Sequence, residues 1–166
     1  SGLTGINPGF FVLMMSPITD ISVVSNYTNL EDFDVEQTPI TALPGLSGLT
    51  NLRIVYCLQN PVMTDISGLA NLTSLEEVVI NECPVSDISA LATCTGLRRL
   101  DLDDNQITDI QPLLDNPNIG NLQAIEIRNN PFAPGTPFCD ENQLNQLQAL
   151  APFTWISHNA ICGEAA

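Results

Sequence analysis

Carboxylates dominate the side chains of this sequence that could do chemistry. The densest group lies in DLDDN at 101–105, where Asp101, Asp103 and Asp104 are close together. This spacing is similar to the start of a calcium-binding loop, because carboxylate oxygens are ligands that calcium prefers. The stretch lacks the following glycine and the distal glutamate of such a loop. We therefore expect weak calcium binding at most and predict no dedicated metal site.

Groups that could serve acid–base or nucleophilic catalysis are sparse. The single histidine, His158, lies far along the chain from any candidate nucleophile, and the chain has no lysine. The sequence also lacks a glycine-rich phosphate loop and a metal-ligand spacing of histidine and cysteine. We therefore predict that the protein is not an enzyme and uses no cofactor.

The charge balance is strongly acidic. The 166 residues include 19 acidic residues and four arginines, which gives a formal net charge of −15. Such a surface repels nucleic acid and anionic membranes, since both require basic patches. It suits cationic partners or metal ions, and solubility alone explains it equally well.

The length and the apolar content indicate one ordered domain, with 44% hydrophobic residues. The apolar run FFVLMM at 10–15 is too short to span a membrane, and it lacks the positively charged flank of a signal peptide. We expect no membrane insertion, and the sequence indicates a mature or excised fragment.

A repeated motif must position these side chains. Segments such as PITDISVV at 17–24 and QITDIQPL at 106–113 recur at steps of 22 or 23 residues. Between them lie segments of the form L-x-x-L-x-L, the last after a step of 25 residues: LEDFDV, LRIVYC, LEEVVI, LRRLDL and LQAIEI. No unit can bury its own apolar side, so the units must stack around a continuous core. We expect the strands to form a parallel sheet with a spacing of roughly 4.8 Å.

Polar residues at fixed positions are expected to close each coil. The corner after each strand holds a short side chain that can bond backbone groups of the turn and of the next coil. These corner residues are Ser16, Thr38, Asn60, Cys83, Asn105 and Asn130. The aspartates of the T-D-I-x-x-L segments precede a short helical turn, and we expect them to cap its free N–H groups. They are Asp20, Asp65, Asp87 and Asp109. A metal-binding ladder is the weaker alternative, since Ala42 interrupts the row.

These residues resemble the leucine-rich repeat family, in the 22-residue subtype found in bacterial internalins and phosphatase-regulatory proteins. The stretch LRRLDLDDNQITDIQPL at 97–113 is similar to the consensus of that subtype. The resemblance implies an α/β solenoid with a curved parallel sheet on the concave face and short helical turns on the convex face. It also implies a binding scaffold, in a family whose partners are diverse. We expect an N-terminal cap or truncated repeat over 1–9, leucine-rich repeats over 10–132 and a small helical C-terminal cap over 133–166.

The five cysteines divide into two groups. Cys57, Cys83 and Cys94 occupy repeat positions, so we expect buried, inert thiols. Cys139 and Cys162 lie outside the repeats, on either side of a predicted helix, and we expect a disulfide between them. A disulfide indicates an oxidising compartment, so we predict a secreted or cell-surface protein.

The segment DENQLNQLQAL at 140–150 predicts the helix of the C-terminal cap, with Asp140 as its N-cap. A terminal coil must cover the exposed end of its core. The apolar residues expected to do so are Leu144, Leu147, Leu150, Phe153, Trp155 and Ile156.

The x positions of L-x-x-L-x-L line the concave face, and all four arginines lie on it. The charges alternate along one row of this face, which consists of Glu31, Arg53, Glu76, Arg98 and Gln123. Each arginine lies one coil from at least one carboxylate, and we expect the arginines mostly to neutralise these neighbours. Exposed pairs of this kind contribute only about 0.2–1 kcal/mol each.

A partner-binding site is predicted where carboxylates lack a basic neighbour and apolar residues gather. An apolar island with an aromatic residue and a charged rim is typical of protein contact sites, although scattered exposed apolar residues are also normal. The predicted site residues are Asp32, Asp34, Glu36, Ile54, Tyr56, Leu58, Val79, Asp101, Asp104 and Glu126. The first strand also exposes Phe10, Val12, Met14 and Met15 on this face, where we expect an upstream segment or cap to cover them.

These features predict a monomeric protein-interaction or adhesion module that binds a partner with basic and apolar features through its acidic concave face. The alternative is a structural or surface-adsorbing module that binds ions, polysaccharide or ice. It would use the regular row of hydroxyls beside the aspartates: Thr19, Thr41, Thr64, Ser86 and Thr108.

Overall fold

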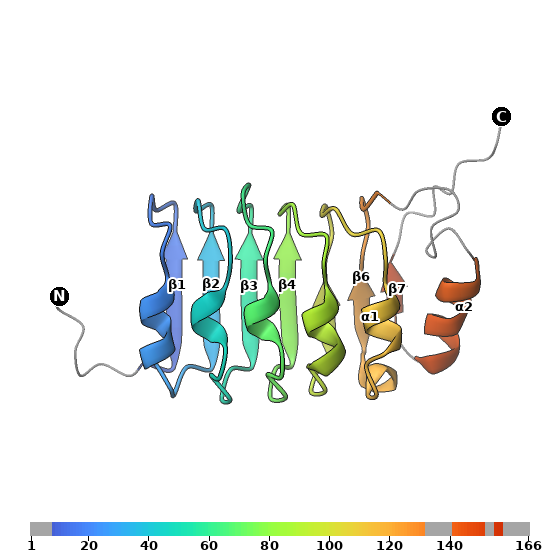
Figure 1. Ribbon diagram of the computed structural model, residues 1–166. Helices are drawn as coiled ribbons and strands as arrows, with labels where there is room; N and C mark the ends of the chain where they lie inside the picture. Colours follow the sequence, from blue (N-terminus) through green and yellow to red (C-terminus); the bar gives the residue numbers. More distant parts are fainter. Residues whose placement is uncertain (1–7, 132–140, 152–154, 158–166) are drawn as a thin grey trace.

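Seven short parallel strands form one open sheet in the computed structural model, which describes residues 8–131, 141–151 and 155–157 (Figure 1). The strands lie side by side in sequence order. They are β1 (Phe10–Met14), β2 (Asp32–Glu36), β3 (Ile54–Leu58), β4 (Glu77–Asn81), β5 (Arg99–Asp101), β6 (Ala124–Glu126) and β7 (Trp155–Ser157). The predicted α/β leucine-rich-repeat solenoid is confirmed.

Short helical turns return the chain on the opposite side of each coil (Figure 1). They are η1 (Ser22–Asn26), η2 (Pro44–Leu46), η3 (Ser67–Leu69), η4 (Ser89–Thr93), α1 (Gln111–Leu114) and η5 (Ile119–Asn121). Neighbouring coils pack so closely here that glycine is required. A Cβ on Gly68 would collide with the carbonyl oxygen of Leu43, and one on Gly96 would collide with that of Thr73.

The inward side chains of all the coils meet in one continuous core. Phe33, Leu52, Val78 and Leu100, from successive coils, are fully buried. Burying a side chain of this size stabilises the fold by about 1.5–3 kcal/mol. Because each coil buries its apolar side only against its neighbours, the stability of the solenoid depends on stacking.

The three repeat cysteines lie in this core, as predicted. Cys57, Cys83 and Cys94 are buried free thiols. Burial raises the pKa of all three, and it raises that of Cys94 to about 11. A thiol with a raised pKa holds little reactive thiolate at neutral pH, so these cysteines are inert.

The corner residues tie each coil to the coil before it. Asn60 is fully buried, and its Nδ2 donates to the carbonyl oxygen of Val35 at 2.9 Å. Its Oδ1 accepts from the backbone N–H and the hydroxyl of Thr38, at 2.9 and 2.8 Å. Asn105 and Asn130 also donate to carbonyl oxygens of the preceding coil, at 2.6 and 2.9 Å. The predicted bonds of the corner asparagines to backbone groups of the turn are confirmed, but their bonds between coils go to the preceding coil and not to the next one.

The residue before each corner has a left-handed backbone, which the repeat pattern did not predict. These residues, with φ between 47° and 56°, are Met15, Gln37, Gln59, Glu82, Asp104 and Asn129. Side chains other than Asn and Asp adopt this region at a cost of order 1 kcal/mol each. A hydrogen-bonded row runs along three of them, from Gln37 to Gln59 at 2.7 Å and from Gln59 to Glu82 at 3.1 Å.

The predicted aspartate caps are also confirmed. The first backbone N–H of each following helical turn donates to the carboxylate at 2.8 Å, in the pairs Ser22–Asp20, Ser67–Asp65, Ser89–Asp87 and Gln111–Asp109. The backbone N–H and hydroxyl of Ser22 lower the pKa of Asp20, and the hydroxyl and N–H of Ser67 lower that of Asp65. These carboxylates are therefore occupied by capping.

The C-terminal part contains the predicted helix, α2 (Glu141–Leu150). Its Leu147 is fully buried in the core, whereas Leu150 is 47% exposed, so the expected covering role of Leu150 was wrong. Trp155 was also expected to cover the core, but it is 58% exposed because β7 extends the sheet and turns this side chain outward beside Ala124. The adjacent Ile156 does pack against the core.

Several predictions about the ends of the chain lie outside the described residues. They concern most of the caps proposed over 1–9 and 133–166, including Phe153 and His158, the side chain of Leu144, and the Cys139–Cys162 disulfide. Among the helices of the described ranges, none is long and apolar enough to cross a membrane.

The hydrogen bonds of the corner asparagines predict a large loss of stability for Asn60→Ala. The substitution removes three hydrogen bonds and leaves the buried Val35 carbonyl and Thr38 N–H without partners. We expect a loss of about 2–4 kcal/mol in the free energy of unfolding, measured by chemical denaturation. Asn51→Ala is the matched control, since it removes one exposed hydrogen bond and should cost less than about 1 kcal/mol. Equal losses of unfolding free energy in both variants would contradict a structural role for the hydrogen bonds of the corner asparagines.

Thiol titration separates the two groups of cysteines. In the native protein Cys57, Cys83 and Cys94 should not react with a thiol reagent at neutral pH, because they are buried. In denaturant without a reductant, three thiols should react if Cys139 and Cys162 form a disulfide, and all five should react after reduction. Five reactive thiols before reduction would exclude the disulfide.

Candidate functional site

The sheet face is the side of the sheet whose side chains point away from the core. Outward and inward residues alternate along each strand, and parallel pairing brings equivalent outward residues into rows. One row follows the predicted order, with Val12, Asp34, Tyr56, Val79, Asp101 and Glu126 as consecutive register partners. The predicted alignment of the coils is therefore confirmed.

Three adjacent strands give the sheet face a sharp pattern. The β1 apolar stripe consists of Phe10, Val12 and Met14, which are exposed by 67%, 53% and 47%. The β2 acidic stripe consists of Asp32, Asp34 and Glu36. The β3 apolar stripe consists of Ile54, Tyr56 and Leu58, all half-buried. Every outward position of β2 is thus a carboxylate, between two rows of apolar side chains.

Asp34 occupies the centre of this pattern. Val12 and Tyr56 are its register partners on the two neighbouring strands. Its Oδ1 is inaccessible to solvent and has no hydrogen-bond partner among the described residues. Desolvation raises the pKa of Asp34, and repulsion from Glu36 adds to the rise. A carboxylate that has lost water without gaining a donor is an unsatisfied acceptor.

The carboxylates of β4 to β6 have partners. Arg99 contacts Glu77 at 3.1 Å on one side and Glu126 at 3.8 Å on the other, so its guanidinium lies over the strand between them. The hydroxyl of Tyr56 donates to the same Glu77 at 3.0 Å, and therefore not to Asp34. Burial and this hydrogen bond raise the pKa of Tyr56.

Part of the predicted site is corrected by these contacts. Val79 and Asp101 were expected to be solvent-facing, but each is only 8% exposed. Glu126 was expected to lack a basic neighbour, but it contacts both Arg99 and Arg128. Asp104 is exposed at a left-handed corner rather than on a strand.

The Asp101–Asp103–Glu126 cluster is the one group of the described residues whose carboxylate oxygens could meet at a metal ion, all within 4.8 Å of one another. Arg128 already supplies a cation there, since its Nε and Nη2 lie 2.7 and 2.6 Å from Asp103 Oδ2. Its Nη2 also lies 3.0 Å from Glu126 Oε2. The hydrogen bond to Asp103 raises the pKa of Arg128. Weak calcium binding in this region stays a prediction.

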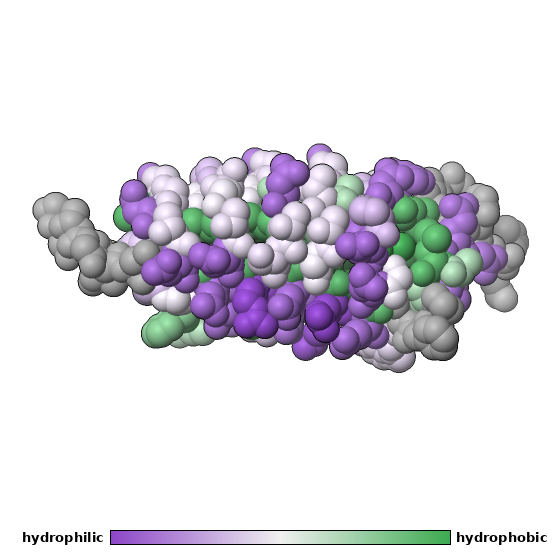
Figure 2. Space-filling model, turned by 90° about the horizontal axis from the view of Figure 1, so that it is seen from below, coloured by the Kyte–Doolittle hydropathy of each residue, from purple (hydrophilic) through white to green (hydrophobic). Residues whose placement is uncertain are grey.

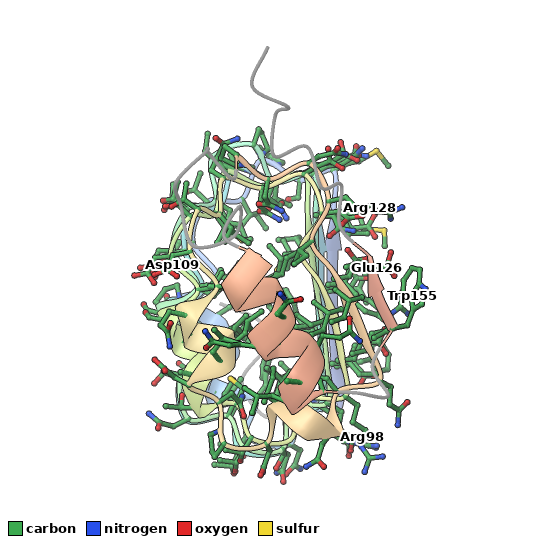
Figure 3. The ribbon with its side chains drawn as sticks, turned by 90° about the vertical axis from the view of Figure 1, so that its right-hand side faces the viewer. Arg98, Asp109, Glu126, Arg128 and Trp155 are labelled. Carbon is green, nitrogen blue, oxygen red and sulfur yellow. The ribbon has the colours of Figure 1, made fainter. Side chains whose placement is uncertain are left out.

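Arg98 differs from the other arginines. Arg53 contacts Glu76 at 3.1 Å, so among the described residues Arg98 alone of the four arginines has no ion pair. The expectation that the arginines mostly neutralise carboxylates of neighbouring coils is confirmed for the other three. Its side chain lies at the end of the molecule where the strands begin, far from Glu126, Arg128 and Trp155 (Figure 3).

An open cleft of about 500 Å³ lies at this end of the sheet, and Arg98 and Arg53 line it together with Glu31 and Glu76. Viewed from that end, hydrophilic side chains gather over the middle coils (Figure 2). The cleft carries both signs of charge in equal number, so it is polar without being selective for cations or anions.

The buried acceptor on Asp34 predicts that Asp34→Asn stabilises the protein at neutral pH. The pKa of Asp34 is raised on folding above its ordinary value of 3.8, so ionisation of Asp34 opposes folding, and this destabilisation grows as the pH rises through the folded-state value. The melting temperature of the variant should therefore exceed that of the wild type at pH 7, by about 1–3 °C, and the difference should vanish near pH 3.

Asp32→Asn is the control for the loss of one negative charge, because Asp32 is exposed on the same strand. A stabilisation of the Asp32 variant equal to that of the Asp34 variant would attribute the effect to net charge and not to the buried acceptor.

Comparison with known proteins supports the repeat assignment. A family model described as leucine-rich repeats, two copies, matches residues 73–152. A search of curated proteins gives no match. Among solved structures, an internalin, InlF, from Listeria monocytogenes is 26% identical with a TM-score of 0.61, and internalin C2 from the same organism is 20% identical with a TM-score of 0.69.

Each of these structures matches 90% of this chain, which in turn covers 46% of the first and 64% of the second. The chain therefore spans between about half and two thirds of these internalins. The stacked coils, the parallel sheet and the matched repeats agree in one assignment: the chain has a leucine-rich-repeat fold, a solenoid similar to that of internalins.

Proposed function

We propose that the protein is a non-enzymatic interaction module that binds a partner protein with basic and apolar features through its acidic sheet face. The leucine-rich-repeat fold supports protein binding in general, since the stacked coils form an extended and rigid surface. The nature of the partner is inferred from the side chains on that surface.

The unpartnered β2 acidic stripe carries the proposal. Glu77 of β4 and Glu126 of β6 form ion pairs with arginines of this chain, whereas no ion pair involves Asp32, Asp34 or Glu36 within the described ranges. The two apolar stripes expose surface on either side of them, which is typical of a contact site with an apolar centre and charged groups. The proposed site therefore keeps seven of the predicted residues: Asp32, Asp34, Glu36, Ile54, Tyr56, Leu58 and Asp104.

Sequence reasoning left the β1 apolar stripe out of the site. The signal was present in Phe10, Val12 and Met14, which alternate with the inward residues of the first repeat. In the structure they are exposed and in register with the β2 acidic stripe. We therefore add them to the proposed surface.

The proposal includes a monomeric state and a secreted or cell-surface location, where the Cys139–Cys162 disulfide would be stable. Adhesion is one form that such binding takes at a cell surface. The acidic sheet face does not suit nucleic acid, because binding to phosphates requires basic residues.

Capture of a partner from candidate extracts tests the sheet face. Asp34→Lys and Tyr56→Ala should each reduce capture, because the first repels a basic partner and the second removes apolar contact area and the bond to Glu77. Binding by the wild type should also weaken in high salt, which screens charges.

Asp115→Lys is the matched control for Asp34→Lys. It makes the same change of charge on the helical side of the solenoid, where Asp115 is exposed and accepts a hydrogen bond from Gln111 at 2.8 Å. Capture should be unchanged in this variant, and all variants should melt close to the wild-type temperature. A partner retained equally by all of them would place the binding site elsewhere.

A surface-adsorbing role is the second candidate, favoured by one observation. The row of hydroxyl side chains is exposed at every position, and the aspartates beside it cap the helical turns. Its members are Thr19, Thr41, Thr64, Ser86 and Thr108. Thr64→Trp should then abolish binding to a polysaccharide or ice surface without lowering the melting temperature. A lower melting temperature with unchanged adsorption would reject this role.

A further inference from the structure

The β2 acidic stripe has a periodicity that restricts what can bind it. Alternate residues of a strand are about 6.6 Å apart, so Asp32, Asp34 and Glu36 form a line of carboxylates about 13 Å long. The two apolar stripes lie about 4.8 Å to either side of this line, which makes the whole pattern about 10 Å wide. The unsatisfied Oδ1 of Asp34 lies at its centre.

We infer that this pattern receives an α-helix of a partner protein, with a line of Lys or Arg along β2 and apolar residues on both sides of the line. Side chains at i and i+4 of a helix are about 6 Å apart along the axis, close to the spacing of the carboxylates. A helix about 10–12 Å in diameter also covers three strands. The inference rests on the proposed function, since it assigns the partner's chemistry at the same face.

The backbone of β1 to β3 favours a helix over an added strand. β2 is paired with β1 on one side and with β3 on the other, so the sheet face above it offers only side chains. A partner segment on this face must satisfy its own backbone hydrogen bonds, and a helix does so internally.

The cation must come from a different protein. The whole chain has four arginines and no lysine, so a second copy cannot supply such a line of positive charges. Three of these arginines are also already in ion pairs. A metal ion is disfavoured as well, because the close group of carboxylates in the described part of the chain is Asp101–Asp103–Glu126 and not the β2 acidic stripe.

Asp34 is the anchor of this arrangement. A guanidinium or ammonium group seated between Val12 and Tyr56 would pair with the partly exposed carboxylate of Asp34 and offset the repulsion between Asp34 and Glu36. Charge-assisted hydrogen bonds of this kind are stronger when flanking apolar groups exclude water. The apolar stripes would then contact the sides of the helix.

Two synthetic helical peptides of identical composition test the inference. The ridge peptide has lysines at i, i+4 and i+8 with leucines on both sides of that line, and the permuted peptide exchanges lysines and leucines so that no cationic line forms. Binding to the purified protein is measured by fluorescence anisotropy. We expect the ridge peptide to bind at least about tenfold more tightly than the permuted peptide.

Variants of the protein locate the binding. Asp34→Asn and Val12→Asn should each weaken binding of the ridge peptide by about tenfold, whereas Asp115→Asn, on the helical side, should not change it. Asp34→Asn remains a fair test of binding because it is expected to be at least as stable as the wild type. Equal affinity for both peptides, no binding of either, or binding unaffected by Asp34→Asn would overturn the inference.

Failure of the inference differs from failure of the proposed function. Suppose that a partner is captured by the wild type and lost in Asp34→Lys, but is not displaced by the ridge peptide. That result would overturn the inference that a helix of the partner binds here, and it would leave the sheet face as the binding surface. A partner captured equally by wild type and Asp34→Lys would reject both. Displacement of the partner by the ridge peptide and not by the permuted one would support both.

Discussion

Stacking of incomplete units is the constraint on which the structure depends. No coil buries its own apolar side, so inward residues such as Phe33 and Leu100 become buried only when neighbouring coils pack on them. The corner asparagines hold neighbouring coils together through hydrogen bonds. Asn60 satisfies backbone groups of its neighbour that would otherwise be buried without partners. Apolar burial and hydrogen bonding therefore enforce one register, and this register sets the rows of the sheet face.

Because the register is fixed, the residues on adjacent strands decide whether a charge on the sheet face is neutralised. Where an arginine follows a carboxylate on the next coil, as with Arg99 and Glu77, the two charges neutralise one another. Where a whole strand is acidic and its neighbours are apolar, as at β2, no such compensation is possible. On one part of the face, around β4 to β6, arginines neutralise carboxylates. On the other part, around β2, the carboxylates have no such partner, and binding is proposed there.

The same division has a cost in stability. The carboxylate of Asp34 is desolvated without a donor, and several corner residues hold left-handed backbones that their side chains disfavour. The left-handed corners recur in every coil, so they belong to the fold. Two buried side-chain oxygens of the described residues lack a hydrogen-bond partner, Asp34 Oδ1 and Asn105 Oδ1, and only that of Asp34 belongs to a strand of the sheet.

The sequence by itself determined the repeat, the strand register, the buried cysteines and the aspartate caps, because each follows from local periodicity and from the period of 22 or 23 residues. It also placed Asp34 and Tyr56 in one row. Only the tertiary structure decided which outward residues are accessible. Val79 and Asp101 are buried although they occupy outward positions, and Trp155 is exposed because a seventh strand extends the sheet. These outcomes depend on how side chains of neighbouring coils pack and on how the last coil ends, which a repeat pattern does not specify.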